Sequence, residues 1–392
     1  MAENMTKDIW NDDDGAKEPP KKRRMLRKFL IFLLVLIAVL GLVLVAAWRD
    51  GTGFDALRRY FAYGTEAVGG EKTVYRYDTD NTNRFARVGT GSLVILSDTS
   101  LRLLGPDGSE GWSANVKMNA PGLGQGGGLA VAYDIGGTTL CVADFKGSKT
   151  DIEPAGEIIS ADLSDSGYLA VCSDAAGYKG AVTVYDTSGK AVYVWYSGTG
   201  YLVRAAVSPD GKYLAVLCLQ DSGSVVHTFA LTSADERGSA ACADELFADL
   251  FWRGGKVCCV SQMRLAFFDD AARLTAEYPF GDLYLYDYAA EGDGFVTLAL
   301  SRYRSGSAEQ LVTVGASGNE LGKCSTTGAV TSLSVNGKQV LVQYSDRLTL
   351  YNQQLDEIKS VEQNLLGVRR SVLLRRGAAL LVSGSSAEVL AF

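Results

Sequence analysis

Short apolar runs separated by tight turns recur from residue 85 to the end of the chain. The clearest copy is the segment 208–216 (SPDGKYLAV). Its proline presets φ for a turn, its aspartate bonds nearby backbone amides, and its glycine accepts positive φ. The apolar residues that follow alternate with others, as in a half-buried strand. Each copy therefore predicts two strands joined by a tight turn.

Eight copies of this pattern follow one another at spacings of roughly 38 to 45 residues, the range expected for the blades of a propeller. They lie at residues 89–94, 126–131, 164–171, 208–216, 253–257, 291–296, 335–340 and 375–380. A third strand and often a fourth follow each turn, for example at 182–190 and 192–195. The sequence predicts an all-β, eight-bladed β-propeller. Seven blades is the alternative count, and 222–247 is the least regular segment.

The last repeat ends after its third strand, at residues 388–392, which leaves one edge of that blade without a partner. The early run 73–77 (TVYRY) has no blade of its own. We expect this run to supply the missing outer strand and close the ring. A pair of β-sandwiches is the alternative β architecture, but self-similarity of about forty residues without a linker favours one ring.

An uncharged apolar stretch precedes the repeats, at residues 29–48 (FLIFLLVLIAVLGLVLVAAW). It has about the 20 residues that a helix needs to cross a membrane. More basic residues precede it than follow it, so the positive-inside rule puts its N-terminal side in the cytoplasm and the repeats outside the cell. A cleavable signal peptide is the alternative, but its apolar core has only about 7 to 15 residues. The predicted parts are a cytoplasmic tail (1–28), a transmembrane helix (29–48), a stalk (49–72) and an extracytoplasmic propeller (73–392).

Composition and charge narrow the possible partners. With 47% hydrophobic and 21% charged residues, the chain can bury a large core. Its formal net charge of -7 argues against nucleic-acid binding, which requires concentrated Lys and Arg. The seven cysteines show no CxxC spacing, and most lie within apolar runs. We expect buried, small apolar side chains there, with a disulfide involving Cys242 or Cys324 as the alternative.

Candidate catalytic motifs are few. Residues 122–127 match GxGxxG, but a strand pattern follows where a phosphate site needs a helix, so we expect a loop between blades. His227 is the single histidine, and we expect a hydrogen-bonded residue on a strand. No GxSxG motif is present. The aspartates in the turns are expected to bond backbone amides; they are Asp107, Asp165, Asp186, Asp210 and Asp293. We predict no catalytic, cofactor-binding or metal-binding residues and no cofactor.

Basic residues gather in two of the repeats. They are Arg369, Arg370, Arg375 and Arg376 in one repeat, and Arg302 and Arg304 in another. A patch for an anionic partner, such as a cell-wall polymer or lipid headgroups, is one interpretation. Solvent-exposed positions at strand edges are the interpretation that we favour.

Two fold-level resemblances follow from the repeat. The segment 208–216 resembles the WD40-like repeat of TolB-type propellers, and 185–190 followed by Trp195 resembles repeats of quinoprotein-like propellers. A closer resemblance joins the basic tail and single span to 119–121 (NAP), 132–137 (AYDIGG) and 182–185 (VTVY). In this order they resemble an uncharacterised, domain-of-unknown-function family of membrane-anchored propellers from Gram-positive anaerobes.

The functional expectation follows from a predicted tether, a predicted ring and the absence of a catalytic motif. We expect a non-enzymatic interaction module at the bacterial cell membrane, whose loops bind an envelope protein or polymer. The alternative is a small-ligand sensor or an enzyme that uses the central channel of the propeller.

Overall fold

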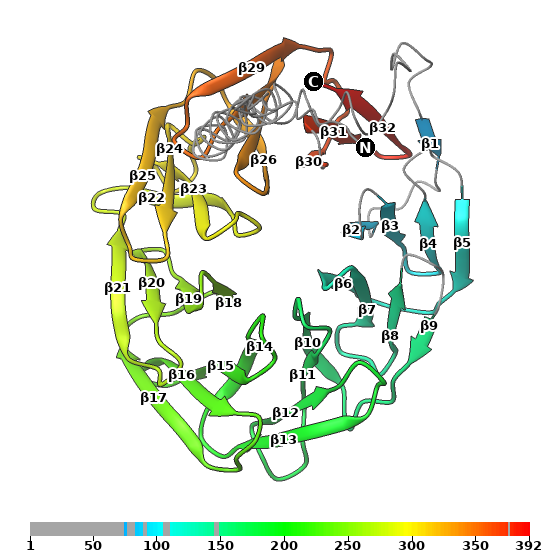
Figure 1. Cartoon of the computed structure of the whole chain (residues 1–392), viewed down its shortest axis with the longest axis vertical. Helices are drawn as coiled ribbons and strands as arrows, with labels where there is room; N and C mark the ends of the chain where they lie inside the picture. Colours follow the sequence, from blue (N-terminus) through cyan, green and yellow to red (C-terminus); the bar gives the residue numbers. More distant parts are fainter. Residues whose placement is uncertain (1–73, 77–82, 89–91, 105–109, 145–148, 375–376) are drawn as a thin grey trace, which may run out of the picture. The chain divides into compact units, whose positions relative to one another are not determined.

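Eight four-stranded antiparallel sheets form a ring of blades in the computed structural model of this chain (Figure 1). The structure describes residues 74–76, 83–88, 92–104, 110–144, 149–374 and 377–392. These residues contain 32 strands and no α-helix. The predicted all-β, eight-bladed propeller is therefore confirmed, and the alternative of seven blades is wrong.

The first four blades follow the chain from residue 84 to residue 243. Blade 1 contains β2 (Arg84–Val88), β3 (Ser92–Leu96), β4 (Ser100–Leu104) and β5 (Glu110–Asn115). Blade 2 contains β6 (Pro121–Gly126), β7 (Leu129–Asp134), β8 (Leu140–Asp144) and β9 (Lys149–Asp151). Blade 3 contains β10 (Ile158–Leu163), β11 (Leu169–Ser173), β12 (Gly180–Tyr185) and β13 (Ala191–Ser197). Blade 4 contains β14 (Tyr201–Val207), β15 (Tyr213–Gln220), β16 (Gly223–Ala230) and β17 (Glu236–Ala243).

The remaining blades follow in the same order. Blade 5 contains β18 (Asp249–Arg253), β19 (Lys256–Val260), β20 (Arg264–Phe268) and β21 (Leu274–Pro279). Blade 6 contains β22 (Tyr284–Ala289), β23 (Phe295–Ser301), β24 (Gln310–Gly315) and β25 (Glu320–Ser325). Blade 7 contains β26 (Val330–Asn336), β27 (Gln339–Tyr344), β28 (Arg347–Tyr351) and β29 (Glu357–Glu362). Blade 8 contains β30 (Arg370–Leu373), β31 (Ala378–Val382), β32 (Ser386–Ala391) and β1 (Val74–Arg76).

In each blade the first strand of the repeat lies on the inside of the ring. The fourth strand of the repeat lies on the outside in blades 1 to 7, and β1 takes that place in blade 8. In Figure 1, β10, β14 and β18 lie toward the centre, whereas β13, β17 and β21 form the rim. The turn that joins the first two strands has the conformation that the repeat predicts. Gly211 has φ of 71°, and its amide donates to the carbonyl of Ser208 at 2.9 Å. A left-handed residue here favours glycine because it has no Cβ.

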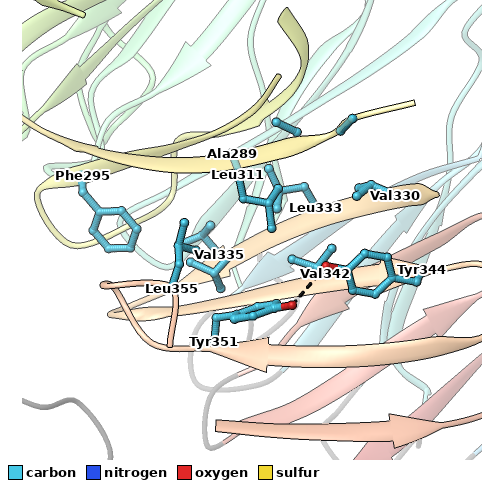
Figure 2. Close-up of a cluster of buried hydrophobic side chains, with 13 residues drawn as sticks. Ala289, Phe295, Leu311, Val330, Leu333, Val335, Val342, Tyr344, Tyr351 and Leu355 are labelled. Carbon is cyan, nitrogen blue, oxygen red and sulfur yellow. Dashed lines mark hydrogen bonds between the residues drawn. The ribbon is translucent and has the colours of Figure 1, made fainter. Parts of the chain in front are cut away.

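Buried apolar side chains join the blades to one another. Among the described residues, eight core clusters are found, one at each boundary between neighbouring blades. Figure 2 shows the cluster between blades 6 and 7, where Phe295 and Leu311 pack with Val335. The hydroxyl groups of Tyr344 and Tyr351 lie 3.1 Å apart within it, so these buried phenols satisfy each other. Burying one such large apolar side chain contributes about 1.5–3 kcal/mol.

The ring closes through the first described strand. β1 pairs with β32 in antiparallel register, with Val74 opposite Glu388 and Arg76 opposite Ser386. Blade 8 also packs on blade 1, through a cluster that includes Leu380 and Leu93. The prediction that the run 73–77 supplies the outer strand of the last blade is confirmed for residues 74–76.

The cysteines are all free thiols. Five of them are buried in the blades, and burial raises the pKa of Cys172 and that of Cys218 to about 12. Cys242 and Cys324 are half-buried on outer strands and form no disulfide. The structure therefore supports the interpretation of small apolar side chains, and the alternative of a disulfide is wrong.

Within the described part of the chain, no helix is long and apolar enough to cross a bilayer. The predicted tail, transmembrane helix and stalk (1–72) lie outside the described residues.

Candidate functional site

An ionic cluster on the inner side of the ring joins four consecutive blades. It consists of Asp162 on β10, Arg204 on β14, Asp249 on β18 and Tyr288 on β22. Arg204 Nη2 donates to Asp162 Oδ1 at 2.8 Å, and its Nε lies 3.2 Å from Asp249 Oδ1 without a hydrogen bond. The hydroxyl of Tyr288 donates to Asp249 Oδ2. We call these four residues the inner-strand cluster.

The local backbone helps to place this cluster. The pairing of β14 with β15 shifts register between Leu202 and Arg204, and that of β22 with β23 shifts between Leu285 and Asp287. A bulge of this kind bends a strand and changes the direction of the side chains beside it. Arg204 and Tyr288 therefore lie just after these bulges. The direction of their side chains does not follow from the regular alternation of inward and outward residues along a strand.

The electrostatics of the inner-strand cluster favour a structural role. Burial raises the pKa of Asp162, and the charge of Arg204 only partly opposes this effect. Burial and the neighbouring carboxylate of Asp249 together raise the pKa of Tyr288, so the phenol keeps its proton. Burial works against the charge of Arg204, but Asp249 and Asp162 outweigh it and raise its pKa. The charged groups are thus paired with one another, and the cluster ties four blades together.

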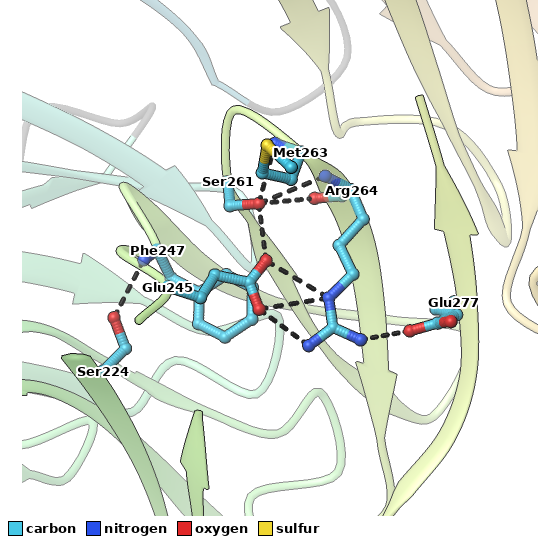
Figure 3. Close-up of polar contacts among 7 residues, drawn as sticks. All are labelled: Ser224, Glu245, Phe247, Ser261, Met263, Arg264 and Glu277. Carbon is cyan, nitrogen blue, oxygen red and sulfur yellow. Dashed lines mark hydrogen bonds and ion pairs between the residues drawn. The ribbon is translucent and has the colours of Figure 1, made fainter. Parts of the chain in front are cut away.

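A second polar cluster lies at one end of blade 5 (Figure 3). Arg264 Nη2 donates to Glu245 Oε2 at 2.7 Å, and Arg264 Nη1 donates to Glu277. The hydroxyl of Ser261 donates to Glu245 Oε1 at 2.7 Å. The hydrogen bonds that Arg264 donates to both carboxylates raise its pKa, those to Glu245 most strongly. This cluster fixes the connection between blades 4 and 5. The guanidinium of Arg264 is already paired with two carboxylates, so its charge is not available to a ligand.

A cavity of about 220 Å³ lies between blades 2 and 3. Its wall includes apolar side chains such as Leu129 and Leu169, together with Asp186. The Oδ1 atom of Asp186 already accepts hydrogen bonds from the amides of Ser188 and Lys190, at 2.8 and 3.0 Å. This carboxylate therefore belongs to a turn, and the cavity gives no reason to assign a ligand.

Across the described ranges, no group of three or more His, Cys, Asp or Glu is arranged to hold a metal ion.

The outer strand of blade 3 presents an unusual surface. Tyr178, Val192, Val194 and Tyr196 are exposed by 53%, 45%, 45% and 51%. The last three occupy alternate positions on β13, and the ring centroids of Tyr178 and Tyr196 lie 4.8 Å apart. We call these four residues the blade-3 edge patch. Tyr193 and Trp195, which alternate with them, pack inward against blade 4.

Other outer strands protect their edges with charge, as edge strands commonly do. The described charged residues that are exposed on them are Asp151 of β9, Glu236 and Arg237 of β17, Glu277 of β21, Glu320 and Lys323 of β25, and Glu357, Lys359 and Glu362 of β29. β13 (AVYVWYS) has no charged residue at all. Sequence analysis missed this surface, although the uncharged run 191–197 was the signal that could have identified it.

The turn aspartates divide into two groups. Asp186 and Asp210 bond backbone amides as predicted. A hydrogen bond from the Ser208 hydroxyl is the main reason why the pKa of Asp210 is lowered. The prediction is wrong for Asp165 and Asp293, whose carboxylates accept no hydrogen bond among the described residues. The hydroxyl of Ser164 takes that role beside Asp165, since it accepts from the amide of Tyr168. Asp107 lies outside the described residues.

His227 is a hydrogen-bonded residue on a strand, as expected. Its Nδ1 lies 2.8 Å from Glu236 Oε1, and its ring lies 5.2 Å from that of Trp195.

The structure describes four arginines of the two predicted basic groups, and all four are exposed. They are Arg302, Arg304, Arg369 and Arg370. This exposure agrees with the favoured interpretation of solvent-exposed positions. Arg375 and Arg376 lie outside the described residues.

The GxGxxG match at 122–127 is not a loop between blades, so that prediction is wrong. Most of it forms β6, the inner strand of blade 2, and β7 follows as its hairpin partner. A Cβ on Gly126 would lie 2.0 Å from the carbonyl oxygen of Leu163 on the next blade. The glycines therefore allow two inner strands to approach closely.

Asp134 links the segments 119–121 and 132–137, which both carry motifs of the family resemblance. Its buried carboxylate accepts hydrogen bonds from the amides of Asn119 and Ala120, at 2.8 and 2.7 Å. The segment 119–121 (NAP) is thereby held against 132–137 (AYDIGG). Gly136, with φ of 77°, makes the turn that follows. These motifs form one structural unit at the start of blade 2.

Solved structures of propellers resemble this chain. BamB from Moraxella catarrhalis has 15% identity and a TM-score of 0.53, with 81% of this chain and 98% of that chain covered. The C-terminal WD40 domain of Sif2 has 9% identity and a TM-score of 0.58, with coverage of 81% and 98%. The computationally designed Ika8 protein has 12% identity and a TM-score of 0.58, with coverage of 82% and 100%. At such identities these similarities show the fold alone.

Sequence comparisons give one family and no characterised relative. The model of a family described as "Family of unknown function (DUF5711)" matches residues 65–363. Among curated proteins, none matches the chain.

Proposed function

Because this chain belongs to the DUF5711 family of unknown function, we propose its role from its own surface: it is a non-enzymatic protein-interaction module that binds a partner through the blade-3 edge patch. The observation that carries the proposal is an apolar, uncharged outer strand, β13, in a ring whose β17, β21, β25 and β29 expose charge. An exposed apolar row of this kind commonly marks a protein interface. The rigid ring holds the patch in a fixed shape, so little ordering of this chain opposes binding.

We also propose where the module is located in the cell. The apolar stretch 29–48 and the basic residues before it favour a tether in the bacterial cell membrane with the propeller outside. A tether confines binding to the surface of the membrane and raises the effective concentration of a partner there. An envelope protein is therefore the partner class that we propose. The alternative, a small-ligand sensor or enzyme in the channel, has less support because the inner-strand cluster pairs its own charges.

The orientation can be tested with epitope tags at the two ends of the full chain. We expect antibodies to label a C-terminal tag on intact cells, and to label an N-terminal tag only after the membrane is permeabilised. The reason is that the basic cluster keeps residues 1–28 in the cytoplasm. Labelling of the N-terminal tag on intact cells, or a C-terminal tag that needs permeabilisation, would contradict the proposed location.

The interaction can be tested by photocrosslinking in cells. Full-length protein would carry a photoreactive phenylalanine derivative at Val194 of β13, or at Ala241 of β17 as a matched, exposed control. We expect one discrete adduct with a second protein from position 194 and none from position 241. Adding Tyr196→Asp should remove the adduct, because a charge in the patch opposes its burial. The absence of an adduct at position 194, or an equal pattern from both positions, would refute the proposed function.

A further inference from the structure

We infer that the partner presents an extended, apolar segment with carboxylates at both ends, and that this segment pairs with β13 as a fifth strand of blade 3. The inference rests on the proposed function and specifies how the blade-3 edge patch binds. It follows from three features of this surface: the free backbone edge, the row of side chains beside it, and the charges at its two ends.

The backbone edge of β13 is open. β13 is the last strand of its sheet, and β12 pairs with one edge only. In the described part of the chain, no other strand pairs with its second edge. Alternate residues of an antiparallel edge strand direct their N–H and C=O groups outward. The seven residues Ala191–Ser197 extend for roughly 23 Å at about 3.3 Å per residue, enough to pair with a segment of similar length.

The side chains favour an apolar segment. Val192, Val194 and Tyr196 recur at every second residue, which is the spacing of side chains on one face of an added strand. Tyr178 extends this surface beyond β13 by its contact with Tyr196. Cross-strand pairs of aromatic and β-branched side chains stabilise neighbouring strands. A partner strand with β-branched residues at alternate positions would cover this row.

Lysines lie at both ends of the edge. Lys190 directly precedes β13, and the amide of Lys179 donates to the carbonyl of Ser197 at the other end. The ammonium of Lys179 donates to the hydroxyl of Tyr201 at 2.8 Å. Neither lysine forms an ion pair with a carboxylate of the described residues. Lys190 interacts electrostatically with Asp186, but Oδ1 of this carboxylate accepts hydrogen bonds from the turn amides of Ser188 and Lys190. Two exposed cations therefore lie at the two ends of β13, and they are complementary to an acidic residue at each end of the bound segment.

The same charges argue against a second copy of this chain as the occupant. In an antiparallel pair of β13 strands centred on Val194, Lys190 of one copy would lie beside the Lys179 end of the other. In a parallel pair, the two Lys190 side chains would lie beside each other. Like charges placed opposite one another are destabilising. The segment of another protein is the occupant that removes this conflict.

The test uses full-length protein in detergent micelles and three fluorescent nine-residue peptides. Each alternates valine and threonine; the first has aspartate at both ends, the second has lysine at both ends, and the third is the first with a central proline. We expect the aspartate-ended peptide to bind about tenfold more tightly than the lysine-ended one at low salt, and less so at high salt. The proline peptide should not bind, because proline cannot donate to the pairing. Hydrogen exchange should slow in β13 and in no other outer strand.

Variants of the protein separate the contributions. Val194→Asp should abolish binding, whereas Ala241→Asp on β17 should leave it unchanged. Because a substitution in β13 can disturb blade 3, a second variant leaves the patch intact. Lys179→Glu with Lys190→Glu should reverse the preference, so that the lysine-ended peptide binds more tightly. That reversal depends on the ends of the strand and is not expected from a general loss of folding.

The outcomes distinguish this inference from the proposed function. Equal binding of both peptides, an unchanged preference in the double glutamate variant, or exchange protection outside β13 would overturn the inference. Formation of a dimer that Val194→Asp dissociates would also overturn it, since the occupant would then be a second copy. A specific crosslink from position 194 to a different protein, together with any of these results, would keep the proposed function and remove only this mode of binding.

Discussion

Replacing Arg204 with leucine is expected to lower the free energy of unfolding by about 2–4 kcal/mol at pH 7, less than a fully buried ion pair would give. The side chain of Arg204 is 36% exposed, which is why solvent screening reduces the effect. Leucine fills part of the volume but leaves Asp162 and Asp249 without their shared cation. Denaturant unfolding of the full chain and of the variant measures the difference, provided that the slope of the free energy of unfolding against denaturant concentration is the same for both.

The pH dependence of the same variant gives an independent check. Burial raises the pKa of Asp162 above its ordinary value of 3.8 in the folded state. Its contribution to stability is therefore fully present below that ordinary value and is lost as pH rises through the folded value. Removing Arg204 raises the folded pKa further, because the opposing charge is gone. The deficit of Arg204→Leu should consequently shrink as the pH is lowered from 7 toward 4.

Asp162→Asn is the matched control for this prediction. It removes one partner of a 2.8 Å ion pair but also removes the cost of burying a carboxylate, and Arg204 keeps Asp249. We expect it to change the free energy of unfolding by less than about 1 kcal/mol at pH 7. If Asp162→Asn were as destabilising as Arg204→Leu, the assignment of Arg204 as the central cation of the inner-strand cluster would be wrong.

Asp134→Ala is expected to cost about 2–4 kcal/mol, because two backbone amides lose a charged acceptor. Asp134 is only 4% exposed, and its carboxylate accepts from the amides of Asn119 and Ala120 at 2.8 and 2.7 Å. Water has little access to replace these bonds at such burial. The loss should appear as a lower denaturant midpoint and as faster hydrogen exchange in β6 and β7.

Asp134→Asn separates the hydrogen bonds from the volume of the side chain. Its carbonyl oxygen can still accept from the amide of Ala120 or that of Asn119, so we expect less than half the loss seen with alanine. Equal losses for the two variants would mean that charge, and not the presence of an acceptor, holds the segment 119–121 in place. No loss in either variant would refute the structural role of Asp134.

Most of the fold could be predicted from the repeat. The turn and alternating strand of 208–216 recur in eight blocks. An incomplete last block and an unassigned run before the first block together predicted the pairing of β1 with β32. Local patterns suffice for the blades because turns and hairpins form between residues close in the chain. The pairing of β1 with β32 joins distant residues, and it could be predicted because the incomplete block leaves an open strand edge. The turn aspartates show the limit: Asp210 acts as predicted, but a serine hydroxyl replaces Asp165.

The candidate sites depended on contacts that local patterns do not encode. Asp162, Arg204, Asp249 and Tyr288 lie about one blade apart in sequence, and two of them follow bulges that alter the alternation of their strands. The blade-3 edge patch could have been anticipated from the uncharged run 191–197. Which of its residues face outward, however, follows only once Tyr193 and Trp195 are seen to pack against blade 4.

The pairing of β1 with β32 also sets the order in which this protein can mature. β1 leaves the ribosome early but has no sheet to join until residues 386–388 have been made. A product that stops before β32 would retain bare strand edges on both β1 and β31, where proteases and other chains can attach. A chain without β32 therefore differs from the closed ring by two unpaired strand edges, and we expect it to be more susceptible to proteolysis and aggregation.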